Sequence, residues 1–214
     1  MILLTGICKY GFSQDNLLLG TMPVFNLNAG LKNGYKFNAK LETRQIIFEE
    51  ESKFHQELVD LATMVSKKTN FNTMLAIGGL IRYRNEEWFY RLIQQYTIVQ
   101  EVNSNRLSHR FRTDQTFNNS RDIEWRLRYR LSSIFPLTGE EVNNQEYYFK
   151  LNNEYVYSMQ GSSHDLEIRI IPTIGFRYSD KNKLELGLDN RFDSFIESKL
   201  NITSWVCINW YISL

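Results

Sequence analysis

Most of the chain alternates between apolar and polar residues with a period of two. In residues 35–44, Tyr35, Phe37, Ala39, Leu41 and Thr43 occupy one phase, and lysine, asparagine, glutamate and arginine occupy the other. Because successive side chains of a β-strand point to opposite faces, this pattern predicts strands with one apolar face and one polar face.

Further runs keep the same alternation, most of them for about ten residues or more: residues 71–83, 122–135, 166–178, 184–193 and 200–214. Residues 53–67 alternate poorly. Their apolar residues Leu58, Leu61, Ala62 and Val65 would also share one face of a helix, but we interpret this segment as a strand.

Short polar turns separate the runs, as at Asn33-Gly34, Asn85-Glu86 and Asp180-Lys181, and only residues 136–145 form a longer connection. The chain is therefore predicted to be one meander of roughly eleven strand-like segments without a second domain. A bacterial single-chain barrel with both ends on one side has an even number of strands. We therefore predict 12 strands, or 10 if Pro23 prevents residues 17–31 from forming a full strand.

The length of the runs favours a membrane barrel. Soluble strands average about five or six residues, whereas membrane-spanning strands need about nine to eleven. Aromatic residues of the apolar phase lie near the ends of runs, as expected for girdles at the two membrane interfaces: Tyr35, Phe54, Phe71, Tyr83, Trp88, Phe117, Phe135, Tyr147, Tyr157, Tyr178 and Trp210.

The predicted fold is thus all-β, a single transmembrane antiparallel up-and-down β-barrel with short turns and a charged lumen. The alternative is a soluble lipocalin-like barrel, which would place the apolar phase inside around a ligand. The length of the runs and the aromatic girdles disfavour that alternative.

Residues 1–14 are interpreted as a signal peptide, and residues 15–214 as the barrel. An apolar run precedes small and polar residues, although no basic residue comes before it and Lys9 interrupts it. The alternative is an ordinary first strand. Cys8 and Cys207 show no metal-ligand spacing, and we expect no disulfide between them, because Cys8 would leave with the signal peptide.

Composition narrows the function classes further. The 214 residues carry a net charge of +1, which argues against a nucleic-acid partner. Mean hydropathy is −0.39, and no apolar run approaches the roughly 18 residues of a membrane-spanning helix. Aromatic residues make up 14% of the chain and there are 3 prolines, a profile typical of strands.

The polar phase is rich in arginine and carboxylates, which would face each other inside a narrow barrel. Arginine suits this position because its planar guanidinium pairs bidentately with carboxylates. We predict a lumen charge network made of Arg44, Arg110, Arg112, Asp114, Glu124, Arg126, Arg128, Arg130, Glu154, Glu167, Arg169, Arg177, Glu185, Asp189 and Arg191. The alternative is a narrow, weakly anion-preferring pore lined by the arginines between Arg110 and Arg130.

An outer-membrane hydrolase is a remote third possibility. His109 falls in the outward phase, and Asn153 on a later strand could orient it, but no outward serine is clearly within reach. The surroundings of His55 and His164 lack a metal-ligand spacing. We therefore expect no enzyme activity, no catalytic or metal site and no cofactor.

Three segments resemble a family of outer-membrane barrels of Gram-negative bacteria that is known only as a domain of unknown function. They are residues 107–117 (LSHRFRTDQTF), 124–137 (EWRLRYRLSSIFPL) and 152–157 (NNEYVY). The chain departs from the family in an early strand, where Met22 and Pro23 replace an expected tryptophan. The resemblance implies a barrel fold and an outer-membrane location, and it brings no activity.

Taken together, we expect a small integral outer-membrane barrel of unassigned activity, a structural or accessory subunit of an envelope complex. Its expected partners are outer-membrane lipid, the barrel-assembly machinery during biogenesis and other outer-membrane proteins in a complex. Residues 200–214 are predicted to close the barrel. Their ending on Trp210, Ile212 and Leu214 resembles the terminal strand that the assembly machinery recognises.

Overall fold

The computed structural model describes residues 17–49, 51–102, 105–119, 121–196 and 201–214. The predicted signal peptide, residues 1–14, lies outside them. The described residues form eleven strands and one short 3-10 turn: β1 (Leu17–Gly30), η1 (Lys32–Gly34), β2 (Tyr35–Glu49), β3 (Glu51–Lys68), β4 (Thr73–Arg84), β5 (Glu87–Val102), β6 (Asn105–Asn118), β7 (Arg121–Pro136), β8 (Glu146–Gln160), β9 (Ser163–Ser179), β10 (Asn182–Asp193) and β11 (Asn201–Ser213).

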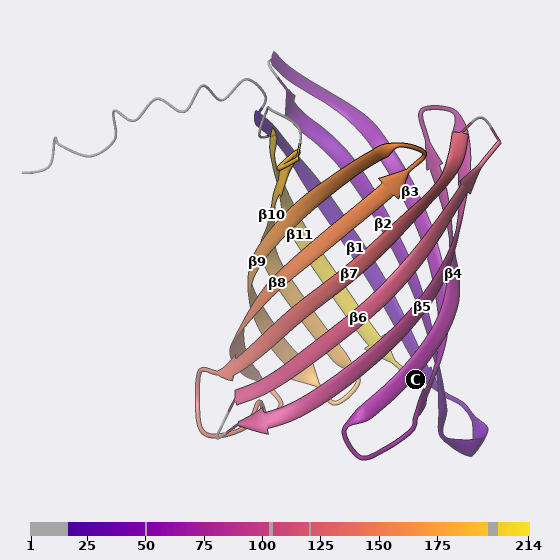
Figure 1. Cartoon of the computed structure of the whole chain (residues 1–214). Helices are drawn as coiled ribbons and strands as arrows, with labels where there is room; N and C mark the ends of the chain where they lie inside the picture. Colours follow the sequence, from indigo (N-terminus) through magenta and orange to yellow (C-terminus); the bar gives the residue numbers. More distant parts are fainter. Residues whose placement is uncertain (1–16, 50, 103–104, 120, 197–200) are drawn as a thin grey trace, which may run out of the picture.

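These strands form a closed barrel in which each strand pairs with its neighbours in the sequence and β1 pairs with β11 (Figure 1). Pairs of consecutive strands are antiparallel, as between β6 and β7, but the closing pair β1–β11 is parallel. The predicted all-β barrel and its closure by the last strand are therefore confirmed.

The predicted count of 12 strands, with 10 as the alternative, is wrong, because the described residues form eleven strands. The prediction assumed that both ends of the barrel lie on the same side, which requires an even number. Here β1 and β11 run in the same direction, with Leu17 opposite Ile202 and Asn28 opposite Ser213. Because the direction reverses at each hairpin, the first and last strands of a meander are parallel only when the number of strands is odd.

Pro23 does not interrupt β1. It lies opposite Ile208 of β11, whereas the register with β2 passes from Thr21 directly to Val24. Proline has no N–H to donate, so it is tolerated where one side of the strand lacks a hydrogen bond. The predicted segment 17–31 therefore contributes a full strand, Leu17–Gly30.

The segment that alternates poorly is strand β3, as predicted. Its register with β2 shifts between Arg44 and Gln45, and again between Ile46 and Phe48. A bulge adds a residue to one strand and changes which face the following residues point to. These shifts explain why the upper parts of β2 and β3 do not keep a simple period of two.

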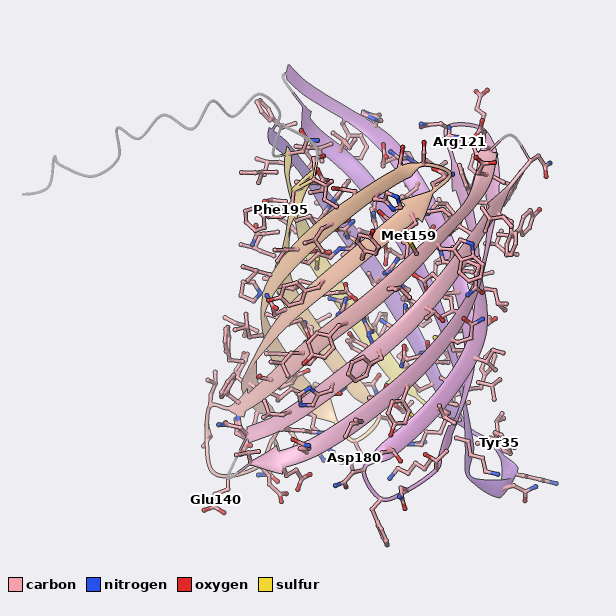
Figure 2. The ribbon with its side chains drawn as sticks, in the orientation of Figure 1. Tyr35, Arg121, Glu140, Met159, Asp180 and Phe195 are labelled. Atoms are coloured by element: carbon pink, nitrogen blue, oxygen red, sulfur yellow. The ribbon has the colours of Figure 1, made fainter. Side chains whose placement is uncertain are left out.

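Turns connect the strands at two rims. Figure 2 shows Arg121, Met159 and Phe195 at the upper rim and Glu140 and Asp180 at the lower rim. β1 begins at the upper rim and β11 ends at the lower rim (Figure 1). The two ends of the barrel wall therefore lie at opposite rims.

The two faces of the wall differ in chemistry. Large apolar side chains are exposed on the outside, for example Ile77 at 58% and Leu186 at 57%. Carboxylates are buried inside, including Glu154, Asp114 and Asp60. This arrangement is the reverse of a lipocalin-like barrel.

Exposed aromatic residues lie at strand ends near both rims: Tyr83, Trp88 and Phe117 near the upper rim, and Tyr35, Tyr147, Tyr178 and Trp210 near the lower rim. A second group lies in the middle of the wall, where the ring centroids of Phe111 and Tyr129 are 5.1 Å apart and those of Tyr129 and Tyr155 are 6.4 Å apart. The described residues contain no helix that is long and apolar enough to cross a membrane.

Candidate functional site

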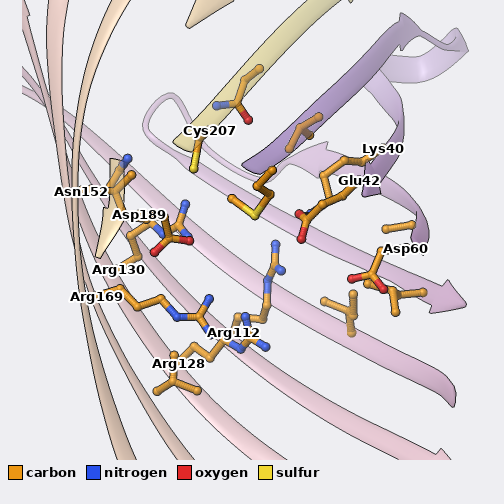
Figure 3. A pocket seen from close by; sticks show the side chains of 18 of the residues that line it. Lys40, Glu42, Asp60, Arg112, Arg128, Arg130, Asn152, Arg169, Asp189 and Cys207 are labelled. Carbon is orange, nitrogen blue, oxygen red and sulfur yellow. The ribbon is translucent and has the colours of Figure 1, made fainter. Parts of the chain in front are cut away.

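The candidate site is the lumen, a cavity of about 520 Å³ bounded by side chains from strands around the whole barrel. Charged residues on β6–β10 face a wall that carries two apolar clusters. One cluster contains Met22, Val24, Ile46, Trp205 and Cys207, and the other contains Ala62, Leu80 and Ile93. Figure 3 shows Arg112, Arg128 and Arg169 on one side of the cavity and Glu42 and Asp60 on the other.

A row of charged residues crosses five consecutive strands of the lumen wall. In register from β6 to β10, the row reads Arg110, Arg130, Glu154, Arg169 and Arg191. The side chain of Glu154 is fully buried, and its Oε1 lies 2.8 Å from Nη2 of Arg110. Its Oε2 lies 2.8 Å from Nη2 of Arg130 and 3.4 Å from Nη1 of Arg169. A single carboxylate thus holds three arginines from three strands.

A second group of ion pairs lies above this row on β6 and β7. Nε of Arg128 is 2.7 Å from Oδ2 of Asp114, across the strand pair. Arg126 donates from Nε to Oε1 of Glu124 at 2.8 Å and from Nη2 to Oε2 at 2.5 Å. The pair of Arg126 and Glu124 is bidentate, the strongest geometry for a guanidinium and a carboxylate.

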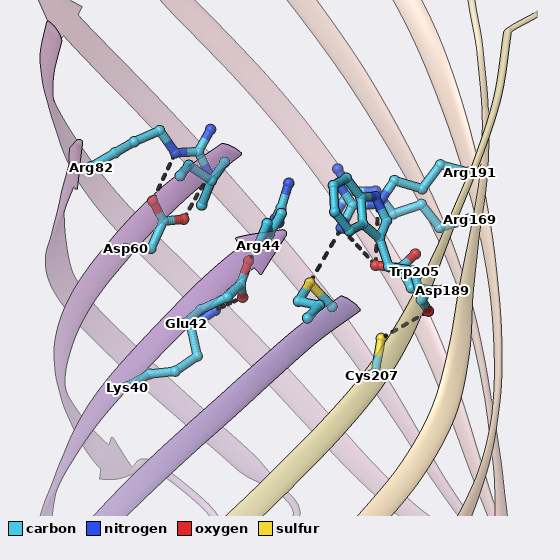
Figure 4. Close-up of polar contacts among 12 residues, drawn as sticks. Lys40, Glu42, Arg44, Asp60, Arg82, Arg169, Asp189, Arg191, Trp205 and Cys207 are labelled. Carbon is cyan, nitrogen blue, oxygen red and sulfur yellow. Dashed lines mark hydrogen bonds and ion pairs between the residues drawn. The ribbon is translucent and has the colours of Figure 1, made fainter. Parts of the chain in front are cut away.

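The opposite wall has its own ion pairs (Figure 4). Arg82 on β4 donates to both carboxylate oxygens of Asp60 on β3, each at 2.7 Å. Glu42 accepts from Arg44 at 2.6 Å and from Lys40 at 2.8 Å. Adjacent residues of the inward phase therefore pair along a strand as well as between strands.

Two contacts connect the charged wall to the apolar clusters. Arg191 pairs with Asp189 at 2.6 Å, and the same Nη2 lies 3.8 Å from the sulfur of Met22. Nη2 of Arg112 donates to Oε1 of Gln95 at 2.6 Å and lies 3.9 Å from the sulfur of Met64. Side chains from strands that are not adjacent in the sheet therefore meet inside the lumen and fill it in part.

Near the lower rim, Glu185 collects three polar groups. It accepts hydrogen bonds from the hydroxyls of Tyr148, at 2.6 Å, and Tyr211, at 3.2 Å, and it pairs with Lys150. Tyr148 fits because the neighbouring strand has Gly175 opposite it, where a Cβ would lie 2.1 Å from the tyrosine ring. The hydroxyl, ammonium and carboxylate groups of the lower lumen thus form one network.

Twelve of the 15 predicted network residues line the lumen cavity, and Asp114 and Glu154 are buried against arginines that line it. Arg177 is the exception, because its Nη2 pairs with the exposed Asp180 at 2.9 Å and its Nη1 donates to the Val142 carbonyl at 2.7 Å. It thereby fixes the long β7–β8 connection at the lower rim. The alternation shows that a residue points inward, but it does not show whether the residue lies in the lumen or at the rim.

Several lumen residues were not predicted from the sequence, notably Asp60, Arg82 and Arg91. Asp60 lies on β3 between the buried apolar residues Leu58 and Ala62 of the same inward phase, so the apolar–polar alternation is lost there. Arg91 could have been found, because Trp88, Tyr90 and Leu92 point outward and the residue between the last two must point inward.

The remote hydrolase arrangement does not form. Nδ1 of His109 is hydrogen-bonded to the hydroxyl of Tyr129 at 2.9 Å, and Leu131 lies between His109 and Asn153 in the sheet register. The outward-facing Ser133 lies opposite Leu107. Within the described part of the chain, no group of three or more histidine, cysteine or acidic residues could hold a metal ion.

Comparison with known proteins gives one match. The profile of the family described as "Protein of unknown function (DUF2490)" matches residues 24–200. No curated protein matches the chain, and no solved structure matches it.

Proposed function

The chain belongs to this family of proteins of unknown function, and we propose that it is an integral β-barrel of the outer membrane of a Gram-negative bacterium. The observation that carries this proposal is the distribution of side chains across the wall. Apolar residues such as Leu75, Ile77 and Leu186 are exposed, while Glu154 and Asp114 are buried inside. In water this arrangement would expose a continuous apolar surface, whereas lipid would cover it.

Two further features support a lipid environment. The shortest strands, β4 and β10, have 12 residues each, enough for the nine to eleven that a crossing requires. The outward polar residues Gln94, Thr113 and Gln115 satisfy one another, with Thr113 donating to Gln94 at 2.6 Å and Gln115 donating to it at 3.1 Å. In hydrocarbon, polar groups need such internal partners.

Within that membrane, we propose a structural or accessory role in an envelope complex. The lumen charge network and the contacts of Arg112 and Arg191 with methionine sulfur leave too little free space for a wide general porin. The proposed partners are outer-membrane lipid, the barrel-assembly machinery during biogenesis and other outer-membrane proteins. We propose no catalytic role and no cofactor.

Fractionation of cells tests the membrane location. We expect the protein in the outer-membrane fraction, and we expect an unheated sample to migrate differently from a boiled one, because closed barrels resist denaturation by detergent. Recovery in the soluble periplasmic fraction would contradict the proposal.

A narrow, weakly anion-preferring pore is a second candidate. It is favoured by the excess of basic over acidic side chains among the described residues that line the cavity. Planar-bilayer recording separates the two candidates. A structural barrel gives no discrete current steps, whereas a pore gives small steps whose anion preference falls in the variants Arg128→Ala and Arg130→Ala.

A further inference from the structure

Arg91 on β5 is a buried arginine that forms no ion pair within the described part of the chain. Its side chain points into the lumen, and the residue is 7% exposed. Nε donates to the hydroxyl of Thr116 at 2.8 Å, and among the described residues no carboxylate pairs with its guanidinium. The terminal N–H groups of Arg91 are therefore left to face the cavity.

Unlike Arg91, the arginines around it form ion pairs with carboxylates. Arg91 is repelled by Arg126, Arg128 and Arg82. The carboxylates of Asp114 and Glu124 attract it, but neither forms an ion pair with it. Each of the three arginines has its own carboxylate, at 2.5 Å, 2.7 Å and 2.7 Å respectively. An unpaired cation in an enclosed site is costly, and three further guanidiniums around it raise that cost. A bound anion would remove it.

The position of Arg91 gives such an anion a route. A second cavity of about 330 Å³ lies above the lumen, between the β4–β5, β6–β7 and β8–β9 turns of the upper rim. The two cavities share Arg82, Arg84, Arg91, Glu124 and Arg126, which we call the neck. An anion entering from the upper rim would reach the neck before the lumen.

We propose that the neck is a binding site for a phosphate-class oxyanion, held by the terminal N–H groups of Arg91. A guanidinium presents parallel N–H donors that match two oxygens of a phosphate group. Chloride is a single spherical acceptor, so it lacks the two oxygens that match these parallel donors. The divalent charge of phosphate also suits a lumen in which basic groups are in excess. This site exists whether or not the lumen conducts, so it goes beyond the proposed membrane role.

Calorimetric titration of the folded protein in zwitterionic detergent micelles at low ionic strength tests the site, with inorganic phosphate as the probe. We expect phosphate to bind and an equal ionic strength of chloride to give no binding heat. In Arg91→Gln, which keeps a side-chain donor for Thr116, we expect the affinity for phosphate to fall about tenfold or more, since a hydrogen bond to a charged group is lost.

Arg106→Gln is the matched control. It removes the same group from an exposed position at the lower rim and should leave the affinity unchanged. Equal phosphate affinity in Arg91→Gln and the unaltered protein, or a fall of the same size in Arg106→Gln, overturns the proposal. Glycerol phosphate as a second probe distinguishes a lipid headgroup from free phosphate as the ligand. If the ester binds as well as phosphate, the ligand is headgroup-like. If the ester does not bind, the ligand is the free ion.

If Arg91→Gln does not fold, a second measurement on the unaltered protein tests the proposal. Phosphate should raise the urea midpoint of the unaltered barrel above that in chloride at the same ionic strength, since a ligand that binds the folded state stabilises it. Equal midpoints in the two salts overturn the proposal. Failure of the membrane location would appear in fractionation and leaves this binding test intact.

Discussion

Glu154 is a fully buried carboxylate with three arginine partners in the lumen. It is 0% exposed and interacts with Arg110, Arg130 and Arg169. The guanidiniums of Arg110 and Arg130 therefore depend on the charge of one β8 carboxylate, whereas Arg169 also pairs with Glu167. Burying charges is costly, and the cost is offset only while each cation keeps its partner.

We therefore expect Glu154→Gln to destabilise the barrel by about 3 to 5 kcal/mol, although glutamine nearly preserves the shape of the side chain. Urea unfolding of the protein in micelles, followed by tryptophan fluorescence, measures this difference. Asp180→Asn is the control, because its pair with Arg177 is at the rim and its side chain is 76% exposed. That change should cost less than about 1 kcal/mol, and an equal cost for the two variants would contradict the argument.

For single residues, the sequence predicts which face of the strand a side chain points to better than which residue it pairs with. Alternation placed Arg110, Arg130, Glu154 and Arg169 in the inward phase. It could not show that they form one row, because that depends on the register of three strand pairs. Arg177 has the same phase but lies at the rim, since only the position of the strand in the barrel decides its depth.

Strands β8 and β9 show how a glycine shapes an element. Gly175 lies opposite Tyr148, and the tyrosine ring occupies the space that a side chain at 175 would need. This close approach directs the Tyr148 hydroxyl to Glu185. The sequence contains both residues, but nothing in the spacing between them reveals that they face each other.

Gly175→Ala should therefore destabilise the barrel by about 1 to 3 kcal/mol, because the new methyl group forces Tyr148 from its place. Gly30→Ala is the matched control, since a Cβ at Gly30 meets no atom within 4 Å. Urea midpoints of the two variants measure the difference. A loss at Gly30→Ala as large as that at Gly175→Ala would show that the tyrosine contact is not the cause.

For the molecule as a whole, the sequence predicted a barrel but not its strand count. Alternation and turns showed roughly eleven segments, and a parity rule for antiparallel closure turned that number into twelve. The pairing of the first strand with the last is invisible in the sequence, because no turn connects them. The parallel pairing of Thr21 with Val206 and its neighbours is therefore a finding of the structure.

A disulfide across the seam tests this closure. In a background with Cys8 and Cys207 replaced by serine, Thr21→Cys combined with Val206→Cys should form a cross-link, because paired strands lie about 4.8 Å apart. Thr21→Cys with Ser204→Cys is the control, since a two-residue offset places the Cα atoms about 8 Å apart. Non-reducing gels measure the yields, and preferential cross-linking of the control pair would rule out the parallel register.

The parallel seam also governs the order of events during folding. Every other strand pair joins neighbours in the sequence, whereas the hydrogen bond between Asn28 and the Ile212 carbonyl spans 184 residues. Closing so long a loop is entropically costly, so the seam should form after the hairpins. Until then the growing sheet has two unpaired edges, which can pair with other chains. The rate of this last step therefore sets how long the nascent protein is vulnerable to aggregation.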